Sequence, residues 1–311
     1  MSGFFSTTFS QPLGSRVVPG ELRGYYIDFR VKARSPAWPP PELQPLAQQL
    51  HVDVAQWGLG AWEHYLASGR EEWLAAALAV GRHLVEQQER DGPLAGGWIH
   101  PWPYPHTFPL DPPWLSGMAQ GEGASLLVRL AAETGDEALL EAGLRARLPL
   151  LRPTDAGGVQ SALDGGPLLE EYPTEPASHV LNGAVFALWG CLDLDLAAGE
   201  PEMRDLFEAG VDTLAQNISR WDTGWWSRYD LFPHPLPNIA SAAYHDLHVT
   251  QLVALDATAP RHALAAAAER WRAYGLRRRS RLRAQASKVA FRLAVPRSAR
   301  LARALPWSRL R

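Results

Sequence analysis

The stretch SHVLNGAVFALWGCLDL, residues 178–194, is apolar on nearly every face when it is drawn as a helix. A helix that is hydrophobic all round is typical of the interior of a large helical protein. The segment EPEMRDLFEAGVDTLAQNI (200–218) follows directly and keeps one polar face. The two segments therefore predict a helical hairpin with a buried inner helix and an amphipathic outer helix.

The same plan recurs along the chain. YLASGREEWLAAALAVGRHL (65–84) resembles LAAETGDEALLEAGLRARLP (130–149), DLAAGEPEMRDLFEAGVDTL (195–214) and, more weakly, LDATAPRHALAAAAERWRAY (255–274). Aligned on Gly69, Gly135, Gly199 and Ala259, the copies lie 66, 64 and 60 residues apart. A period of this size indicates repeated helical units that bury one another's faces. We predict an all-α, (α/α) toroid of helical hairpins with a repeat of about 60–66 residues; the alternative is an open solenoid.

Composition limits the class of protein. An apolar content of 46% in 311 residues is ample for a core, and 13 Trp suit either a large helical core or a surface that stacks on sugar rings. The single cysteine, Cys191, excludes an intramolecular disulfide and is expected to be a buried core residue. The N-terminus lacks the pattern of a signal peptide, and no run of 18 apolar residues occurs. We expect a cytoplasmic protein.

Charge is divided unevenly along the chain. Residues 272–311 hold 13 Lys and Arg and no acid, which leaves the first 271 residues with a net charge of −16. We expect an N-terminal extended segment (1–45), a helical catalytic domain (46–275) and a basic amphipathic tail (276–311). The tail fits an anionic membrane surface, with a solvated basic tail as the alternative. The acidic body disfavours nucleic acid.

The motif EEYPTEP (170–176) precedes the apolar helix, and Pro176 is expected to open that helix. In a toroid the inner helices point the same way, so the loops before them share one rim. The stretches at 114–130, 227–238 and 242–252 should reach this rim, where a helix dipole favours an anion. They supply, with the motif, the side chains Glu171, Tyr172, Tyr229, Tyr244, His245 and His248.

These stretches carry a family resemblance. PPWLSGMAQGEGASLLVRL, EEYPTEPASHVLNG, DTG…YDL and PN…YH…H…QL, in this order, resemble the C-terminal catalytic domain of the D-glucuronyl C5-epimerases over about residues 70–275. VDVAQWGLGAWEHYL (52–66) is similar to a further family segment, although the large β-domain of the animal enzymes has no room here. The resemblance implies an isomerase that inverts C5 of D-glucuronate residues in an oligo- or polysaccharide, with no organic cofactor.

The chemistry of that reaction gives the motif a role. The C5 proton is α to a carboxylate, so its removal needs a base on one face and a proton donor on the other. The resemblance implies Glu171 and Tyr244 as this pair, with Tyr172 and Tyr229 also important for activity. Alternatively, Glu171 only complements a helix N-terminus and the tyrosines are half-buried aromatics. Candidates for binding the substrate are Asn182, His245, His248 and Gln120.

Three features remain open. Trp102 and Tyr104, in the loop 96–114, either stack on sugar rings or belong to a rigid cover of the rim. His245 and His248 lack a third partner at metal-ligand spacing, so we expect no metal site. Phe232 stands where the animal enzymes have an arginine, which puts a sulfated substrate in doubt.

Two other functions compete with the epimerase. A polysaccharide lyase would share the proton abstraction but expel the C4 substituent, and a non-catalytic glycan-binding protein would keep the fold alone. For an epimerase with a basic tail, a glycan on a lipid carrier at the inner membrane face is a candidate partner.

Overall fold

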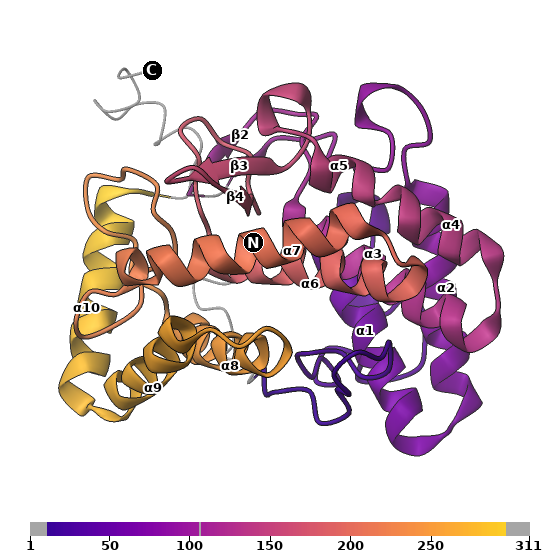
Figure 1. Cartoon of the computed structure of the whole chain (residues 1–311), viewed down its shortest axis with the longest axis horizontal. Coiled ribbons are helices and arrows are strands. Elements are labelled where there is room, and N and C mark those ends of the chain that lie inside the picture. The colour runs from indigo at the N-terminus through magenta and orange to yellow at the C-terminus, as the bar shows by residue number, and fades with distance from the viewer. Residues whose placement is uncertain (1–10, 106, 297–311) are drawn as a thin grey trace.

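The computed structural model describes residues 11–105 and 107–296 (Figure 1). Its α-helices are α1 (His51–Ser68), α2 (Glu71–Gln87), α3 (Gly117–Thr134), α4 (Glu137–Arg145), α5 (Arg147–Leu151), α6 (Leu181–Ala198), α7 (Pro201–Asn217), α8 (Ala242–Thr258), α9 (His262–Leu276) and α10 (Arg278–Ala294). Two short antiparallel hairpins accompany them: β1 (Tyr104–Pro105) with β2 (Pro109–Leu110), and β3 (Gln160–Leu163) with β4 (Gly166–Leu169). The fold is the all-α, (α/α)-toroid class that the sequence predicts.

The predicted repeat corresponds to the hairpins α1–α2, α3–α4, α6–α7 and α8–α9. Gly69, Gly135 and Gly199 each follow the inner helix of a hairpin with φ between 65° and 71°, and each donates its N–H to the last turn. Only glycine adopts this left-handed conformation without steric cost, so it ends the helix and lets the chain reverse. Ala259, the weaker fourth match, has φ −146° and ends α8 without that conformation.

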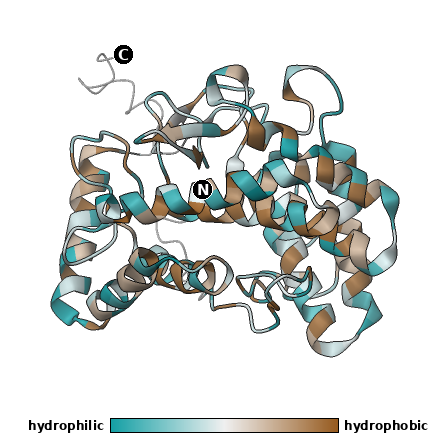
Figure 2. Ribbon diagram, in the orientation of Figure 1, coloured by the Kyte–Doolittle hydropathy of each residue, from teal (hydrophilic) through white to brown (hydrophobic). Residues whose placement is uncertain are grey.

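Inner and outer helices differ in burial as predicted. All residues from Leu181 to Leu194 of α6 are buried, whereas α7 mixes hydrophilic and hydrophobic residues along its length (Figure 2). α6 is long and apolar enough to cross a membrane, but 78% of it is buried inside the fold, as in the core helix of a globular domain. Cys191 is buried there, as expected. Much of the tryptophan also belongs to the core, with full burial of Trp57, Trp62, Trp98, Trp189, Trp221, Trp226 and Trp271.

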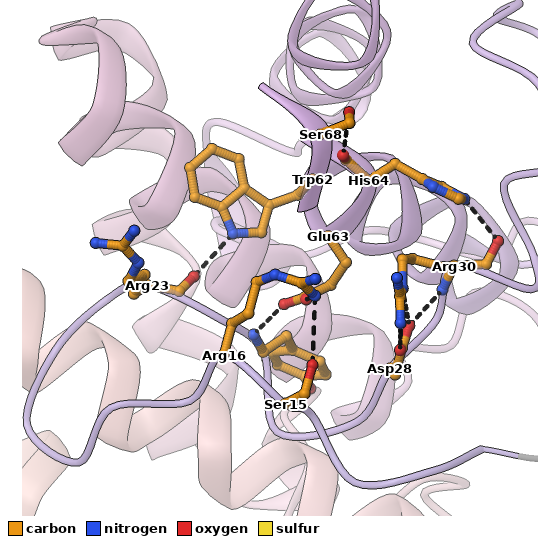
Figure 3. Close-up of polar contacts among 10 residues, drawn as sticks. Ser15, Arg16, Arg23, Asp28, Arg30, Trp62, Glu63, His64 and Ser68 are labelled. Carbon is orange, nitrogen blue, oxygen red and sulfur yellow. Dashed lines mark hydrogen bonds and ion pairs between the residues drawn. The ribbon is translucent and has the colours of Figure 1, made fainter. Parts of the chain in front are cut away.

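The inner helices pack in a row, with α3 between α1 and α6, and α8 beyond α6. The N-terminal segment packs against this row of helices through residues 23–29. Arg129 of α3 and Asp193 of α6 form a fully buried ion pair at 2.5 Å, and the Tyr26 hydroxyl donates to Asp193 at 2.8 Å. The backbone of this segment also binds α1, where Tyr25 N–H donates to Glu63 at 2.6 Å and Trp62 donates to the Arg23 carbonyl (Figure 3). The N-terminal segment is therefore part of the core.

A β-hairpin delivers the acidic motif to the rim. β3 and β4 are joined by Asp164 and Gly165, with φ of 49° and 87°. Two consecutive left-handed residues make the tight turn that Asp-Gly favours between antiparallel strands. β4 packs against α6 and α7, and Glu170 follows its last residue directly. The hairpin thus fixes where the motif begins.

The expected start of α6 at Pro176 is wrong, because the helix begins at Leu181. His179 has φ +48°, in the left-handed region, so the backbone from Pro176 to Val180 cannot be helical. The His179 N–H, which a helix would have directed along its axis, instead donates to the carboxylate of Glu170 at 2.8 Å.

The basic tail begins as a folded helix. α10 packs against α8 and α9 at one edge of the molecule (Figure 1), and its Phe291 is fully buried. The remainder of the predicted tail, 297–311, lies outside the described residues. The proposed domain boundaries stay a prediction.

Candidate active site

The N-terminal ends of the inner helices meet at one rim, as the toroid predicts. Gly117 N–H at the start of α3 donates to the Glu170 carbonyl at 2.8 Å, and Leu181 N–H at the start of α6 donates to the Tyr229 carbonyl at 3.2 Å. Leu50, just before α1, packs on a second apolar cluster, called here the rim cluster: Phe108, Leu110, Trp114, Tyr172, Val180 and Tyr229. The loops before α1, α3 and α6 and the loop 227–239 therefore converge here.

Glu170 anchors the motif. Its buried carboxylate accepts hydrogen bonds from the hydroxyls of Ser161 (2.6 Å) and Ser178 (2.8 Å) and from the backbone and ring nitrogens of His179 (2.8 and 2.7 Å). Burial alone raises the pKa of Glu170, but the hydrogen bonds and the charge of His179 outweigh it and hold the pKa below its usual value. Glu170 is thus an ionised structural residue.

Glu171, one residue later, has the opposite character. Burial, the largest effect, and the charges of Glu170 and Asp230 together raise the pKa of its carboxyl to about 7, although hydrogen bonds from Tyr172 and Asn182 lower it. A carboxyl group with a pKa near neutrality can take up and release a proton at working pH, which general acid–base catalysis needs. The pKa of Glu170 is lowered and that of the adjacent Glu171 is raised, so Glu171 is the better candidate for acid–base catalysis.

Three tyrosines extend from Glu171 to the surface. Tyr172 and Tyr229 are buried and hydrogen-bonded to each other, whereas Tyr244 is 37% exposed. The rings of Tyr229 and Tyr244 meet edge to face with centroids 5.0 Å apart. Burial raises the pKa of Tyr229 well above 10, and the charge of Glu171 adds to this effect, so the hydroxyl of Tyr229 stays protonated. The structure therefore brings together Glu171, Tyr172, Tyr229 and Tyr244.

The first turn of α6 positions the Glu171 carboxylate. Asn182 donates to it at 3.4 Å, and the Asn182 carbonyl in turn accepts from Gln251 at 3.0 Å. Gly183 lies so close that a Cβ there would stand 2.4 Å from the Glu171 Cβ and 2.5 Å from Oε2. Only a residue without a side chain leaves room for the carboxyl group. The motif VLNG thus places two residues against the Glu171 carboxyl group. Asn182 was predicted to bind substrate, and Gly183 was not singled out in the sequence.

Gln120 and His245 are not brought to this group. Gln120 is fully buried and braces the loop before α3, accepting from Trp98 N–H at 2.9 Å and donating to the Gly96 carbonyl at 3.0 Å. The rings of His245 and Trp226 are stacked with centroids 3.7 Å apart. The two ring nitrogens of His245 are hydrogen-bonded to the Ser227 hydroxyl (2.8 Å) and the Trp271 carbonyl (2.9 Å). Burial lowers the pKa of His245 to about 4, so it is neutral. The side chains of Gln120 and His245 therefore stabilise the packing of the loops and helices around them.

His248 is also buried, with Nδ1 at 3.0 Å from the Ser227 hydroxyl. Burial lowers its pKa well below 6.5, and the electrostatic influence of the neighbouring His245 and Lys288 adds to this. Within residues 11–105 and 107–296, no three His, Cys, Asp or Glu side chains converge as metal ligands do.

The aromatic residue beside the motif is Trp114, which the sequence did not single out. Its ring stacks on His100 at 4.0 Å and lies 6.2 Å from that of Tyr172. The ring of Trp102 lies edge to face with that of His100, with centroids 5.9 Å apart, and the Trp102 carbonyl accepts the Trp114 indole N–H. Tyr104 lies in β1, and its side chain is outside the described part of the chain.

A cavity of about 260 Å³ opens next to the rim cluster. Trp114 forms part of its wall, together with Pro113, Leu115, Pro173, Thr174 and Glu175. It therefore adjoins the EEYPTEP motif. A volume of this order accommodates about one sugar ring.

The loop 227–239 also contributes Asp230, which the sequence did not single out, and Phe232. Asp230 is fully buried, accepts from the Asn238 amide and lies 3.5 Å from His234. Phe232 packs on Phe108 of the rim cluster at 5.3 Å, so the position where the animal enzymes carry arginine is filled by an aromatic contact. Sequence spacing gave no signal for the contact between Phe232 and Phe108, because it joins loops more than 100 residues apart.

Known proteins resemble this chain in sequence. A D-glucuronyl C5-epimerase of Caenorhabditis elegans is 33% identical over 230 residues, which are 68% of this chain and 37% of that protein. An uncharacterized protein of Methanocaldococcus jannaschii is 24% identical over 193 residues, 59% of this chain and 61% of its own length. The chain therefore spans less than two thirds of either relative.

One solved structure, of a UGL variant with dGlcA-Glc-Rha-Glc, aligns over 85% of this chain and 78% of its own, with 14% identity and a TM-score of 0.49. So distant a likeness adds nothing on function. The family model described as D-glucuronyl C5-epimerase C-terminus matches residues 91–273, more than half of the chain, and this range includes the EEYPTEP motif. On this match and the 33% identity, the chain belongs to the D-glucuronyl C5-epimerase C-terminus family.

Proposed function

We propose that the protein is a carbohydrate C5-epimerase that inverts D-glucuronate residues within an oligo- or polysaccharide. The observation that carries the proposal is Glu171, a buried carboxyl group with a pKa of about 7 at the start of a line of three tyrosines. Membership of the epimerase family agrees with it.

In the proposed reaction, ionised Glu171 removes the C5 proton. The electron pair of the broken C–H bond moves toward the substrate carboxylate and gives an enolate-like dianion. A new C–H bond then forms on the opposite face, with the proton of the Tyr244 hydroxyl. A tyrosine suits this step because its usual pKa near 10 keeps it protonated and able to donate.

The surroundings support this division of roles. Tyr172 and Asn182 hydrogen-bond the Glu171 carboxylate and hold it in one orientation, while Glu170 fixes the backbone beside it. Tyr244, being 37% exposed, exchanges its proton with water between turnovers. Solvent hydrogen should therefore appear at C5.

The test is deuterium incorporation at C5 in heavy water with a panel of glucuronate-containing oligosaccharides. We expect exchange in the wild type and a loss of about 10²–10⁴-fold in Glu171→Gln and Tyr244→Phe, the usual range for an acid–base residue. Glu202→Gln, an exposed acid of α7, and Tyr65→Phe, a remote tyrosine, are the matched controls. Exchange that survives both site substitutions would refute this assignment.

The same incubation separates the alternatives. A lyase would release an unsaturated uronate that absorbs in the near ultraviolet, without stable deuterium at C5. A non-catalytic glycan-binding protein would bind an oligosaccharide without exchange, and Tyr244→Phe would leave its affinity unchanged.

We further propose that the glycan is lipid-linked and that α10 meets an anionic membrane at the cytoplasmic face. Its exposed apolar residues Leu282, Val289 and Leu293 lie 7 and 4 positions apart, on one helix face, among basic residues. Replacing the three by serine should abolish co-sedimentation with anionic liposomes. Unchanged co-sedimentation would remove the support for a membrane partner.

A further inference from the structure

The inner face of α10 forms one wall of the candidate active site. Phe291 is fully buried, and its ring lies 5.0 Å from that of His234, which contacts Phe232 and Phe108 in turn. The next residue, Arg292, donates to the Thr107 hydroxyl at 2.7 Å. α10 therefore ties the loop before α3 to the loop before α8.

Lys288 lies on the same inner face, one turn before Arg292. Its ammonium group donates to the Asn238 side-chain oxygen at 2.8 Å and to the Ile239 carbonyl at 2.9 Å, and it stands 5.6 Å from the centre of the Tyr229 ring. The Asn238 carbonyl accepts the Tyr229 backbone N–H at 2.7 Å. The loop thus fixes Lys288 and Tyr229 against each other.

The charge of Lys288 also affects a titratable group on α8. Besides burial and His245, Lys288 lowers the pKa of His248 on α8. Glu171 and Asp230 both raise the pKa of the Tyr229 hydroxyl. Tyr229 therefore lies close to the Lys288 ammonium group and within the electrostatic influence of two carboxyl groups.

An acidic substrate needs this cation. The chain up to residue 271 has a net charge of −16, and the groups assembled around Glu171 are acids, phenols and an amide. A uronate carboxylate brought to them meets repulsion from like charge. A half-buried ammonium group offsets it, because charge-assisted hydrogen bonds are strong where water is partly excluded.

We propose that Lys288 binds the carboxylate of the uronate residue on which the enzyme acts. The inference rests on the proposed function for the identity of the substrate. Lys288 neutralises the carboxylate in the bound state and the second negative charge that develops on it when the C5 proton leaves. The basic helix is then part of the substrate site.

The test compares the wild type with Lys288→Gln and Lys288→Arg, and with Arg279→Gln, which removes the same charge from an exposed position of the same helix. The probes are a glucuronate-containing oligosaccharide and its carboxyl-reduced counterpart. Affinity is measured by calorimetry, and turnover by C5 deuterium exchange. Far-ultraviolet circular dichroism confirms that each variant is folded.

We expect the wild type to prefer the acidic oligosaccharide about 10- to 100-fold, as a charge-assisted hydrogen bond gives. Lys288→Gln should lose this preference and raise KM similarly, Lys288→Arg should keep most of it, and Arg279→Gln should match the wild type. A wild type that binds both probes equally, or neither, overturns the inference without need of a variant. So does Lys288→Gln with an unchanged preference and KM.

Failure of the two proposals can be told apart. A wild type that prefers the acidic probe through Lys288 but never exchanges C5 hydrogen supports the site and refutes the epimerase. Exchange that Lys288→Gln leaves intact supports the epimerase and refutes Lys288.

Discussion

Replacing Glu171 by glutamine should make the protein more stable and inactive. Its pKa is raised from 4.5 to about 7 in the folded state, mainly by burial, so the folded protein resists ionisation of this group. Each pKa unit corresponds to about 1.4 kcal/mol, which makes the cost of ionisation about 3 kcal/mol above pH 7. Glutamine never ionises and is free of this cost.

The effect depends on pH with a definite sign. The penalty is absent below the unfolded pKa of 4.5, grows as the pH rises toward 7, and is complete above the folded pKa. At pH 5 it is less than about 1 kcal/mol. If weaker hydrogen bonds to Tyr172 and Asn182 cost the glutamine about 1 kcal/mol, the net gain is about 2 kcal/mol at pH 8 and near zero at pH 5.

Urea unfolding of the wild type and Glu171→Gln at pH 5 and pH 8 measures this difference. Glu170→Gln is the matched control, since the pKa of Glu170 is lowered and its ionised form stabilises the fold. Glu170→Gln should be destabilised at both pH values, and its deficit should fade only below about pH 4.5. A Glu171→Gln variant that is less stable than the wild type at pH 8, or equally shifted at both pH values, refutes the reasoning.

Three further predictions concern the scaffold. Gly183→Ala should disturb the Glu171 carboxyl by overpacking, so that C5 exchange falls about 10²-fold while the fold stays intact by circular dichroism. Asp193→Asn should lower the free energy of unfolding by about 3–5 kcal/mol in urea titrations, since it leaves Arg129 as an uncompensated buried charge. Gly199→Ala should cost about 1 kcal/mol in the same assay, because it forces a left-handed φ of 65° on an alanine.

The sequence predicted those parts of the fold that depend on local pattern. The helical period set inner and outer helices, and the glycines at positions 69, 135 and 199 marked where the inner helices end. The predicted start of α6 at Pro176 was wrong. The positive φ of His179 accompanies a hydrogen bond from its backbone N–H to the side chain of Glu170, and the periodicity of the sequence does not reveal this contact. The hairpin at residues 160–169 was missed although its Asp-Gly turn is a local signal.

The candidate site was predicted in composition but not in detail. Glu171 and the three tyrosines lie together because the loops before the inner helices share a rim. His245 looked equally available on its helix, yet the stacking of Trp226 and the bonds to Ser227 and Trp271 bury it. Lys288 could not be found, since its place depends on how α10 packs across a distant loop.

The binding of the N-terminal segment to α6 also dictates the order in which the chain can fold. Tyr26 leaves the ribosome before its partner Asp193, which is synthesised 167 residues later. Until then Tyr25, Ile27 and Phe29, all fully buried in the finished protein, have no completed surface to cover them. Contacts over such separations form late and slowly. A nascent chain that stalls before α6 therefore exposes the aromatic segment around Tyr26, and a chaperone that binds this segment would protect it until α6 is made.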